Sequence, residues 1–218
     1  CVKTIHTMTT NNKIELMAPA GNFESLQAAL DNGCDSVYFG VEQLNMRARA
    51  SVNFTMDDLA EIAKRCEAKN VRSYLTLNTI IYDHDLSVVK TLINKAKEAN
   101  ITAVIASDQA VIAMARSVGM EVHISTQLNV TNIETIKFYS LFADTMVLSR
   151  ELSLRQVKKI TEQIEKEQIK GPNGNLVEIE IFGHGALCMA VSGKCYLSLH
   201  SHNSSANRGA CKQNCRKK

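Results

Sequence analysis

The chain has 218 residues, of which 45% are hydrophobic and 22% are charged, and its 25 basic and 22 acidic residues give a formal net charge of +3. This composition is ordinary for a globular domain with a sizeable core, and the charge balance neither demands nor excludes a nucleic-acid partner. No apolar run reaches the roughly 18 residues of a membrane span, so we expect no membrane partner and a cytoplasmic protein with reduced thiols.

Both ends of the sequence suggest a fragment of a longer protein. Residues 1–13 are predicted to be disordered or a leftover of cloning, since Met8 would be a natural start just before the first apolar run. The last residues, CKQNCRKK, stop without a helix, a strand or an obvious cap.

From residue 14 onward, short apolar runs alternate with helical patterns. Several runs are hydrophobic throughout, as expected of strands that are buried on both faces of a parallel sheet. The seven predicted strands are 14–19, 36–40, 71–78, 102–107, 122–126, 145–149 and 177–183. Six helices lie between them, and each is opened by a polar residue that suits a helix N-terminus: Asn22, Thr55, Asp85, Asp108, Asn132 and Ser153.

This strict alternation predicts an α/β fold with a parallel sheet and right-handed crossovers. No G-x-G-x-x-G motif follows the first strand, which argues against a doubly wound dinucleotide-binding sheet. We therefore predict a parallel, TIM-like (β/α) barrel portion over residues 14–185, incomplete in this chain. A cysteine-rich segment follows at residues 186–218.

Polar residues follow several of the predicted strands, where a barrel places its ligands. Asn78 and Gln127 are not needed as helix caps, so they are candidates for hydrogen bonds to a substrate. Glu151 and His184 are further catalytic candidates by position, and Arg150 is a candidate substrate ligand. The alternative for Arg150 and Glu151 is an ion pair at the rim.

The loop after the second predicted strand carries Arg47 and Arg49. Alternating arginines on an extended loop can hold a carboxylate or a phosphate through paired hydrogen bonds. The alternative is a solvated loop that binds no ligand, and the spacing of the two arginines alone slightly favours this alternative.

Four of the seven cysteines lie near the end of the chain with the spacing C-x6-C-x15-C-x3-C: Cys188, Cys195, Cys211 and Cys215. Only the last pair has the spacing of a zinc knuckle, but four thiolates suit either zinc or an iron–sulfur centre. A nucleophilic cysteine is a further alternative, because Cys188 follows His184 by four residues. Cys34 and Cys66 are interpreted as packed small side chains.

Taken together, these motifs resemble the collagenase-like peptidase family, which also includes bacterial tRNA and ribosomal RNA hydroxylation proteins. The resemblance is carried by IFGHGALCMAVSGKCYLS and ANRGACKQNCR, and in order by ELMAPAGNFESLQAALDNGCDSVYFG, NMRARASVNF, HISTQLNVTN and VLSRELSL. It spans residues 15–216 and is nearest the branch that hydroxylates tRNA uridine at carbon 5 with prephenate.

The resemblance implies an oxygen-independent hydroxylase with a [4Fe–4S] cluster held by the four clustered cysteines, with zinc as the alternative metal. It implies tRNA or another RNA as partner and prephenate, a small anionic metabolite, as co-substrate. Arg47, Arg49 and Arg150 would then hold the anion, while Asn78 and Gln127 orient the base. The alternatives are a collagenase-like peptidase, a 23S rRNA cytidine hydroxylase and a non-catalytic RNA-binding barrel.

Overall fold

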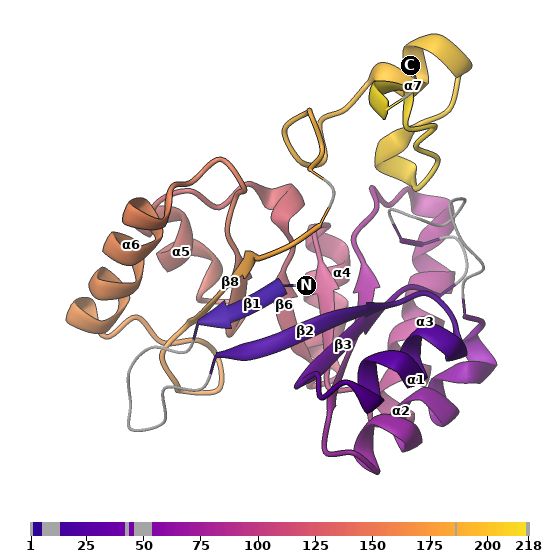
Figure 1. Ribbon diagram of the computed structural model, residues 1–218, viewed down its shortest axis with the longest axis horizontal. Helices are drawn as coiled ribbons and strands as arrows, with labels where there is room; N and C mark the ends of the chain where they lie inside the picture. The colour runs from indigo at the N-terminus through magenta and orange to yellow at the C-terminus, as the bar shows by residue number, and fades with distance from the viewer. Residues whose placement is uncertain (1, 6–13, 42–43, 46–53, 186, 217–218) are drawn as a thin grey trace.

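The computed structural model describes residues 2–5, 14–41, 44–45, 54–185 and 187–216 (Figure 1). All seven predicted strands are confirmed within a few residues at each end, and they pair parallel to their neighbours in chain order. The strands are β2 Glu15–Ala20, β3 Ser36–Phe39, β4 Arg72–Leu77, β5 Ala103–Ala106, β6 Glu121–Ile124, β7 Thr145–Val147 and β8 Glu178–Phe182.

A further strand, β1 Val2–Ile5, lies where the sequence predicts disorder or a cloning leftover. It pairs antiparallel with β2 on one side and with β8 on the other, so the sheet closes into a ring. Strand β1 supplies hydrogen-bond partners to two edges that would otherwise be unpaired. It stands in the place of an eighth parallel strand and its helix, so the (β/α) barrel is incomplete, as predicted. Residues 6–13 lie outside the described residues.

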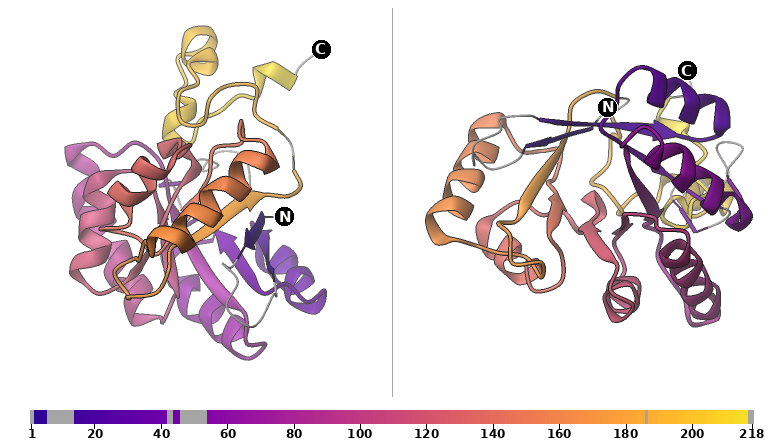
Figure 2. Two further views of the ribbon diagram at one scale, coloured as in Figure 1. Left: turned by 90° about the vertical axis from the view of Figure 1, so that its left-hand side faces the viewer. Right: turned by 90° about the horizontal axis from the view of Figure 1, so that it is seen from below.

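The six predicted helices are confirmed, and Figure 2 shows helices on the outer side of the curled sheet. They are α1 Phe23–Asp31, α2 Leu59–Glu67, α3 Leu86–Glu98, α4 Gln109–Ser117, α5 Ile133–Tyr139 and α6 Leu154–Glu167. The side chains of Asn22, Asp108, Asn132 and Ser153 accept hydrogen bonds from backbone N–H groups of the first turns, as N-caps do. Among the described residues, no helix combines the length and apolar character needed to cross a membrane.

Side chains along the strands alternate between two environments. In β4, Leu75 and Leu77 belong to the main apolar core between sheet and helices, whereas Tyr74 packs inside the barrel with Met17 and Ile105. The same alternation places Ile179 of β8 in the main core. The strands are therefore buried on both faces, as the sequence predicts, but their inner face is partly polar.

Candidate functional site

The cysteine-rich segment, residues 187–216, forms a small lobe beyond the loops that follow the parallel strands (yellow in Figure 1). It contains one helix, α7 Leu197–His202, and two 3₁₀ turns, η4 Ala206–Arg208 and η5 Asn214–Arg216. Two groups of contacts attach it to the barrel, one at Ser192 and one at Arg208.

The first attachment joins Ser192 to the loops after β6 and β7. Asn129 Nδ2 donates to the Ser192 carbonyl at 3.0 Å, and Arg150 Nη2 donates to Ser192 Oγ at 2.7 Å. Arg150 also contacts the carbonyl of Ala190 at 3.4 Å. The guanidinium group of Arg150 therefore holds the segment in place, and its predicted role as a ligand for an anion stays a prediction.

The second attachment joins Arg208 to the loop after β4. Arg208 Nη1 donates to the carbonyl of Ile80 at 2.7 Å and pairs with Asp85, and its guanidinium lies 4.3 Å from the centre of the Tyr82 ring. The Ile80 N–H donates in turn to the carbonyl of Asn207 at 3.1 Å. The hydrogen bond from Arg208 lowers the pKa of Asp85, which keeps this carboxylate charged.

Between the strand ends and the segment lies a pocket of about 100 Å³. It is lined by Asn78, Ile80, Ser107, Gln127, Gly193 and Asn207. The structure thus brings together the predicted residues Asn78 and Gln127 at the end of the barrel where (β/α) barrels bind ligands. Asn207 is a lining residue that the sequence pattern does not single out, although it lies within the family motif ANRG.

Gly193 and Ser125 position the side chain of Gln127. A Cβ atom on Gly193 would lie 2.9 Å from the Cβ of Gln127, and the φ of Gly193 is +72°, so this site suits glycine alone. Ser125 Oγ donates to Gln127 Oε1. The Nε2 of Gln127 has no hydrogen-bond partner among the described residues, so it remains available as a donor to a ligand.

The other predicted residues do not line this pocket. Glu151 is exposed and accepts a hydrogen bond from Ser149 Oγ, which lowers the pKa of the Glu151 carboxyl. His184 is also exposed, and its predicted catalytic role stays a prediction. Arg47 and Arg49 lie outside the described residues.

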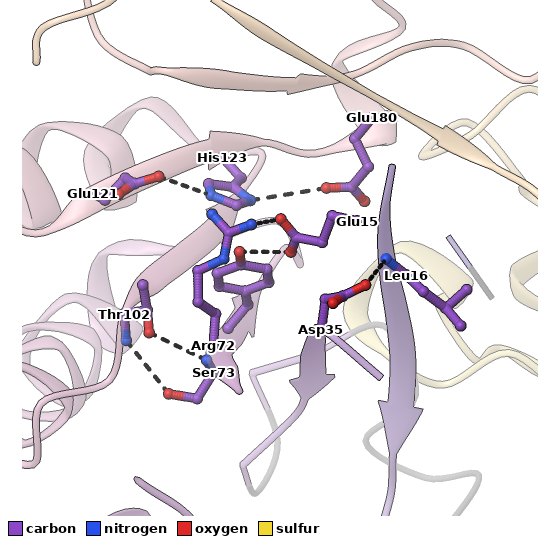
Figure 3. Close-up of polar contacts among 10 residues, drawn as sticks. Glu15, Leu16, Asp35, Arg72, Ser73, Thr102, Glu121, His123 and Glu180 are labelled. Atoms are coloured by element: carbon purple, nitrogen blue, oxygen red, sulfur yellow. Dashed lines mark hydrogen bonds and ion pairs between the residues drawn. The ribbon is translucent and has the colours of Figure 1, made fainter. Parts of the chain in front are cut away.

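A second polar cluster lies inside the barrel near the opposite ends of the strands (Figure 3). Arg72 pairs with Glu15, and His123 lies 3.2 Å from Glu121 and 3.8 Å from Glu180. Burial by itself lowers the pKa of His123, but the two carboxylates outweigh it and raise the pKa to about 9. Glu15, Arg72 and Glu121 are the first residues of their strands, and His123 and Glu180 lie within theirs. Because none of these residues follows the C-terminal end of a strand, we interpret the cluster as stabilising the barrel.

The four clustered cysteines do not form a metal site in this structure. Cys188, Cys211 and Cys215 are exposed and Cys195 is half-buried. Within the described ranges, no group of three or more His, Cys, Asp or Glu side chains could hold a metal ion. The thiols as placed here do not fit a four-thiolate cluster, so such a cluster requires residues 187–216 to adopt another arrangement.

The predicted nucleophile Cys188 is not paired with a base in the described part of the chain. No hydrogen bond or ion pair there involves the thiol of Cys188. Ser201 Oγ lies 2.7 Å from His202 Nδ1, but this hydroxyl donates its proton to the Leu197 carbonyl at 2.7 Å. Neither Ser201 nor His202 lines the pocket at the barrel mouth.

The fold is an incomplete (β/α) barrel with a pocket at its mouth. The profile of peptidase family U32 matches residues 21–218. The chain therefore belongs to peptidase family U32, and the predicted resemblance is confirmed.

Two relatives with different names match 94% of this chain. A protein named collagenase from Porphyromonas gingivalis strain W83 is 59% identical over 206 residues, which cover 50% of that protein. The tRNA hydroxylation protein P1 of Bacillus subtilis strain 168 is 33% identical over 207 residues, or 46% of its length. The chain thus spans about half the length of these curated relatives.

A solved structure described as a U32 peptidase supports the fold. It superposes with a TM-score of 0.57 at 15% sequence identity, over 72% of this chain and 66% of that structure. At 15% identity, this similarity shows a shared barrel fold and says nothing about the reaction.

Proposed function

We propose that this protein takes part in the oxygen-independent hydroxylation of RNA, with C5 of a tRNA uridine as the target. The observation that carries the proposal is the pocket at the barrel mouth, whose lining residues include Asn78, Gln127 and Asn207 and no charged residue. Amides donate and accept hydrogen bonds, so they suit the edge of a nucleobase. The match of 94% of the chain to a tRNA hydroxylation protein supports the same reading.

The reaction replaces the C5–H bond of the base by a C5–OH bond, which is a two-electron oxidation of the base. The balance therefore requires a co-substrate that is reduced by two electrons, either by giving up the oxygen atom itself or by accepting the electrons while water supplies the oxygen. Prephenate has this role in the proposal. A [4Fe–4S] cluster on Cys188, Cys195, Cys211 and Cys215 remains part of the proposal, with zinc as the alternative. In the described structure the four thiols are not gathered into a metal site.

Proteolysis of collagen-like chains is the second candidate function. One observation favours it, the 59% identity to a protein named collagenase. Against it stands the thiol of Cys188, which has no base paired with it in the described residues. It predicts gelatin hydrolysis that is lost in Cys188→Ala or His184→Ala and that does not depend on iron.

A nucleoside profile of RNA from a strain that lacks the gene tests the proposal. We expect 5-hydroxyuridine to disappear from tRNA, while 5-hydroxycytidine in ribosomal RNA stays constant. Unchanged 5-hydroxyuridine would contradict the proposal. If 5-hydroxycytidine is lost from ribosomal RNA instead, the substrate is 23S rRNA and not tRNA.

A further inference from the structure

The acidic and basic residues are distributed unevenly along the chain. Residues 1–180 hold all 22 acidic residues and 19 of the 25 basic ones, a net charge of −3, whereas residues 181–218 hold six basic residues and no acidic one. The small net charge of the whole chain therefore arises from a slightly acidic barrel and a strongly basic cysteine-rich segment. A surface of one sign attracts a partner of the opposite sign, so the segment is suited to a polyanion.

Three cations of the segment are available to such a partner. Lys194, Lys212 and Arg216 are exposed, and no ion pair involves them in the described parts of the chain. Arg208 differs, because its ion pair with Asp85 attaches the segment to the barrel. The charges of the three exposed residues are therefore not neutralised by neighbouring carboxylates.

The last described residues of the segment pack beside α7. The backbone N–H of Lys212 donates to Ser198 Oγ at 3.0 Å, and Asn214 Nδ2 donates to Ser201 Oγ at 2.6 Å. These bonds place Lys212 next to the first turn of α7, which Tyr196 precedes. Tyr196 is 65% exposed. An exposed aromatic ring near cationic side chains is typical of a surface that binds single-stranded nucleic acid.

The basic segment adjoins the pocket at the barrel mouth (Figure 1). Lys194 follows the lining residue Gly193, and Arg208 follows the lining residue Asn207. The pocket measures about 100 Å³, whereas sites for drug-sized molecules have volumes of about 300 Å³ or more. A macromolecule therefore cannot bind mainly inside the pocket, and its affinity has to come from the surface around it.

We infer that the cysteine-rich segment binds single-stranded RNA, with Lys194, Lys212 and Arg216 contacting phosphates. Tyr196 stacks on an unpaired base of the same strand. The choice of RNA among polyanions rests on the proposed function, whereas the binding surface and its residues go beyond it. An acidic polypeptide also satisfies the cations, but it has no base that stacks on the tyrosine ring.

Fluorescence anisotropy with a dye-labelled RNA of about 12 uridines tests the inference. Binding is measured between about 50 and 200 mM salt, because each phosphate contact adds about 0.7 to the slope of log Kd against the logarithm of the salt concentration. We expect Lys194→Gln/Lys212→Gln to weaken binding at least about fivefold and to lower this slope by about 1.4. The control Lys64→Gln/Lys166→Gln removes the same charge from the last turns of α2 and α6, which lead into the N-terminal ends of β4 and β8. It should bind like the wild type.

Tyr196→Ala tests the stacking contact separately from the charges. We expect it to weaken binding at least about fivefold, while the salt slope stays that of the wild type. The control Phe138→Ala removes an exposed aromatic ring from α5 and should leave binding unchanged. Arg216→Gln repeats the charge test at another exposed position and should lower the slope by about 0.7. Melting temperatures close to that of the wild type confirm that the variants fold.

Three outcomes would overturn the inference. These are no binding of the RNA by the wild type, RNA binding by the folded segment variants that equals that of the controls, and displacement of the RNA by polyaspartate as readily as by unlabelled RNA. The last outcome would assign the surface to an acidic polypeptide.

The proposed function fails separately. If tRNA from the deletion strain lacks 5-hydroxyuridine but the segment variants bind RNA like the wild type, the inference falls and the function stands. If the segment binds RNA but the tRNA is unchanged, the function falls and the inference stands.

Discussion

At the scale of single residues, Gly193 connects the cysteine-rich segment to the pocket. Its φ of +72° is a backbone conformation that favours glycine, and a Cβ there would contact Gln127 at 2.9 Å. The residue therefore satisfies two requirements at once, a left-handed turn and a close approach. Its position in the sequence shows only a glycine between two cysteines, because the contact is made with a residue 66 positions earlier.

Gly193→Ala is expected to destabilise the fold by about 2–3 kcal/mol, since left-handed strain and overpacking add. The matched control is Gly174→Ala, whose φ is +81° but whose Cβ would meet nothing within 4 Å. It should lose only about 1 kcal/mol, from the backbone conformation. Urea unfolding of both variants measures the difference, and equal losses would show that the contact with Gln127 is unimportant.

His123 makes stability depend on pH. Its pKa in the folded protein is about 9, above the value of about 6.5 in an unfolded chain, so folding favours the protonated form. The stabilisation is therefore complete below about pH 6.5 and is lost as pH rises through about 9, by roughly 1–3 kcal/mol. Glu121, Glu180 and Tyr74 lie next to His123, and Asp144 also interacts with its charge.

Urea unfolding between pH 6 and pH 10 checks this prediction. The variant His123→Gln keeps a polar side chain but cannot titrate, so its stability should be lower and should change less across this range. The exposed His84 serves as control, and His84→Gln should follow the wild type. A wild-type stability that stays constant to pH 10 would contradict the assigned charge on His123.

At the scale of elements, the strands and helices of the barrel could be predicted because each carries a local signal. Apolar runs and N-cap residues such as Asn22 and Ser153 are visible without tertiary contacts. Strand β1 could not be predicted, because its pairing depends on two distant edges, β2 and β8. The polar inner face has a similar origin: in VEIEIFG the glutamates enter the barrel, where they meet charges from other strands.

The attachment through Arg208 should control the order of the segment from α7 onward. Arg208→Ala removes the ion pair with Asp85 and the bond to the Ile80 carbonyl, at a cost of roughly 1 kcal/mol. Hydrogen exchange of the Ile80 amide, which donates to Asn207, should become about fivefold faster. Arg155→Ala, on the exposed face of α6, should leave this exchange unchanged. An unchanged rate in Arg208→Ala would show that other contacts hold the segment.

At the scale of the whole molecule, the sequence indicates the barrel and its family, and the strand topology and the family match confirm these. That the C-terminal ends of the strands bind a ligand stays a prediction. The sequence also indicates Asn78 and Gln127 as neighbours because both follow parallel strands. It does not indicate Asn207, which reaches the pocket only when the segment folds back over the barrel. Whether the four thiols come together depends on how the cysteine-rich segment folds. The spacing of the cysteines in the sequence does not determine this.

Thiol reactivity tests the cluster proposal. In the metal-free protein, Cys188, Cys211 and Cys215 are exposed and should react quickly with a disulfide reagent. Cys34 and Cys66 should react slowly, because burial raises the pKa of both thiols, to about 11 for Cys66. Anaerobic reconstitution with iron and sulfide should protect the four clustered cysteines and add about four irons per chain. Unprotected thiols without iron, or one bound zinc, would contradict the iron–sulfur proposal.

The central claim, that the barrel mouth selects a tRNA uridine for hydroxylation, is tested most directly by complementation. The deletion strain receives the gene for the wild type, for Asn207→Leu or for the control Asn94→Leu. Asn207 lines the pocket, whereas Asn94 lies on α3 and is not among the lining residues. The 5-hydroxyuridine content of the tRNA is then measured. We expect the wild type and Asn94→Leu to restore the modification and Asn207→Leu, at equal protein level, to restore at most about a fifth of it. Full restoration by Asn207→Leu, or no difference between the deletion strain and its parent, would contradict the claim.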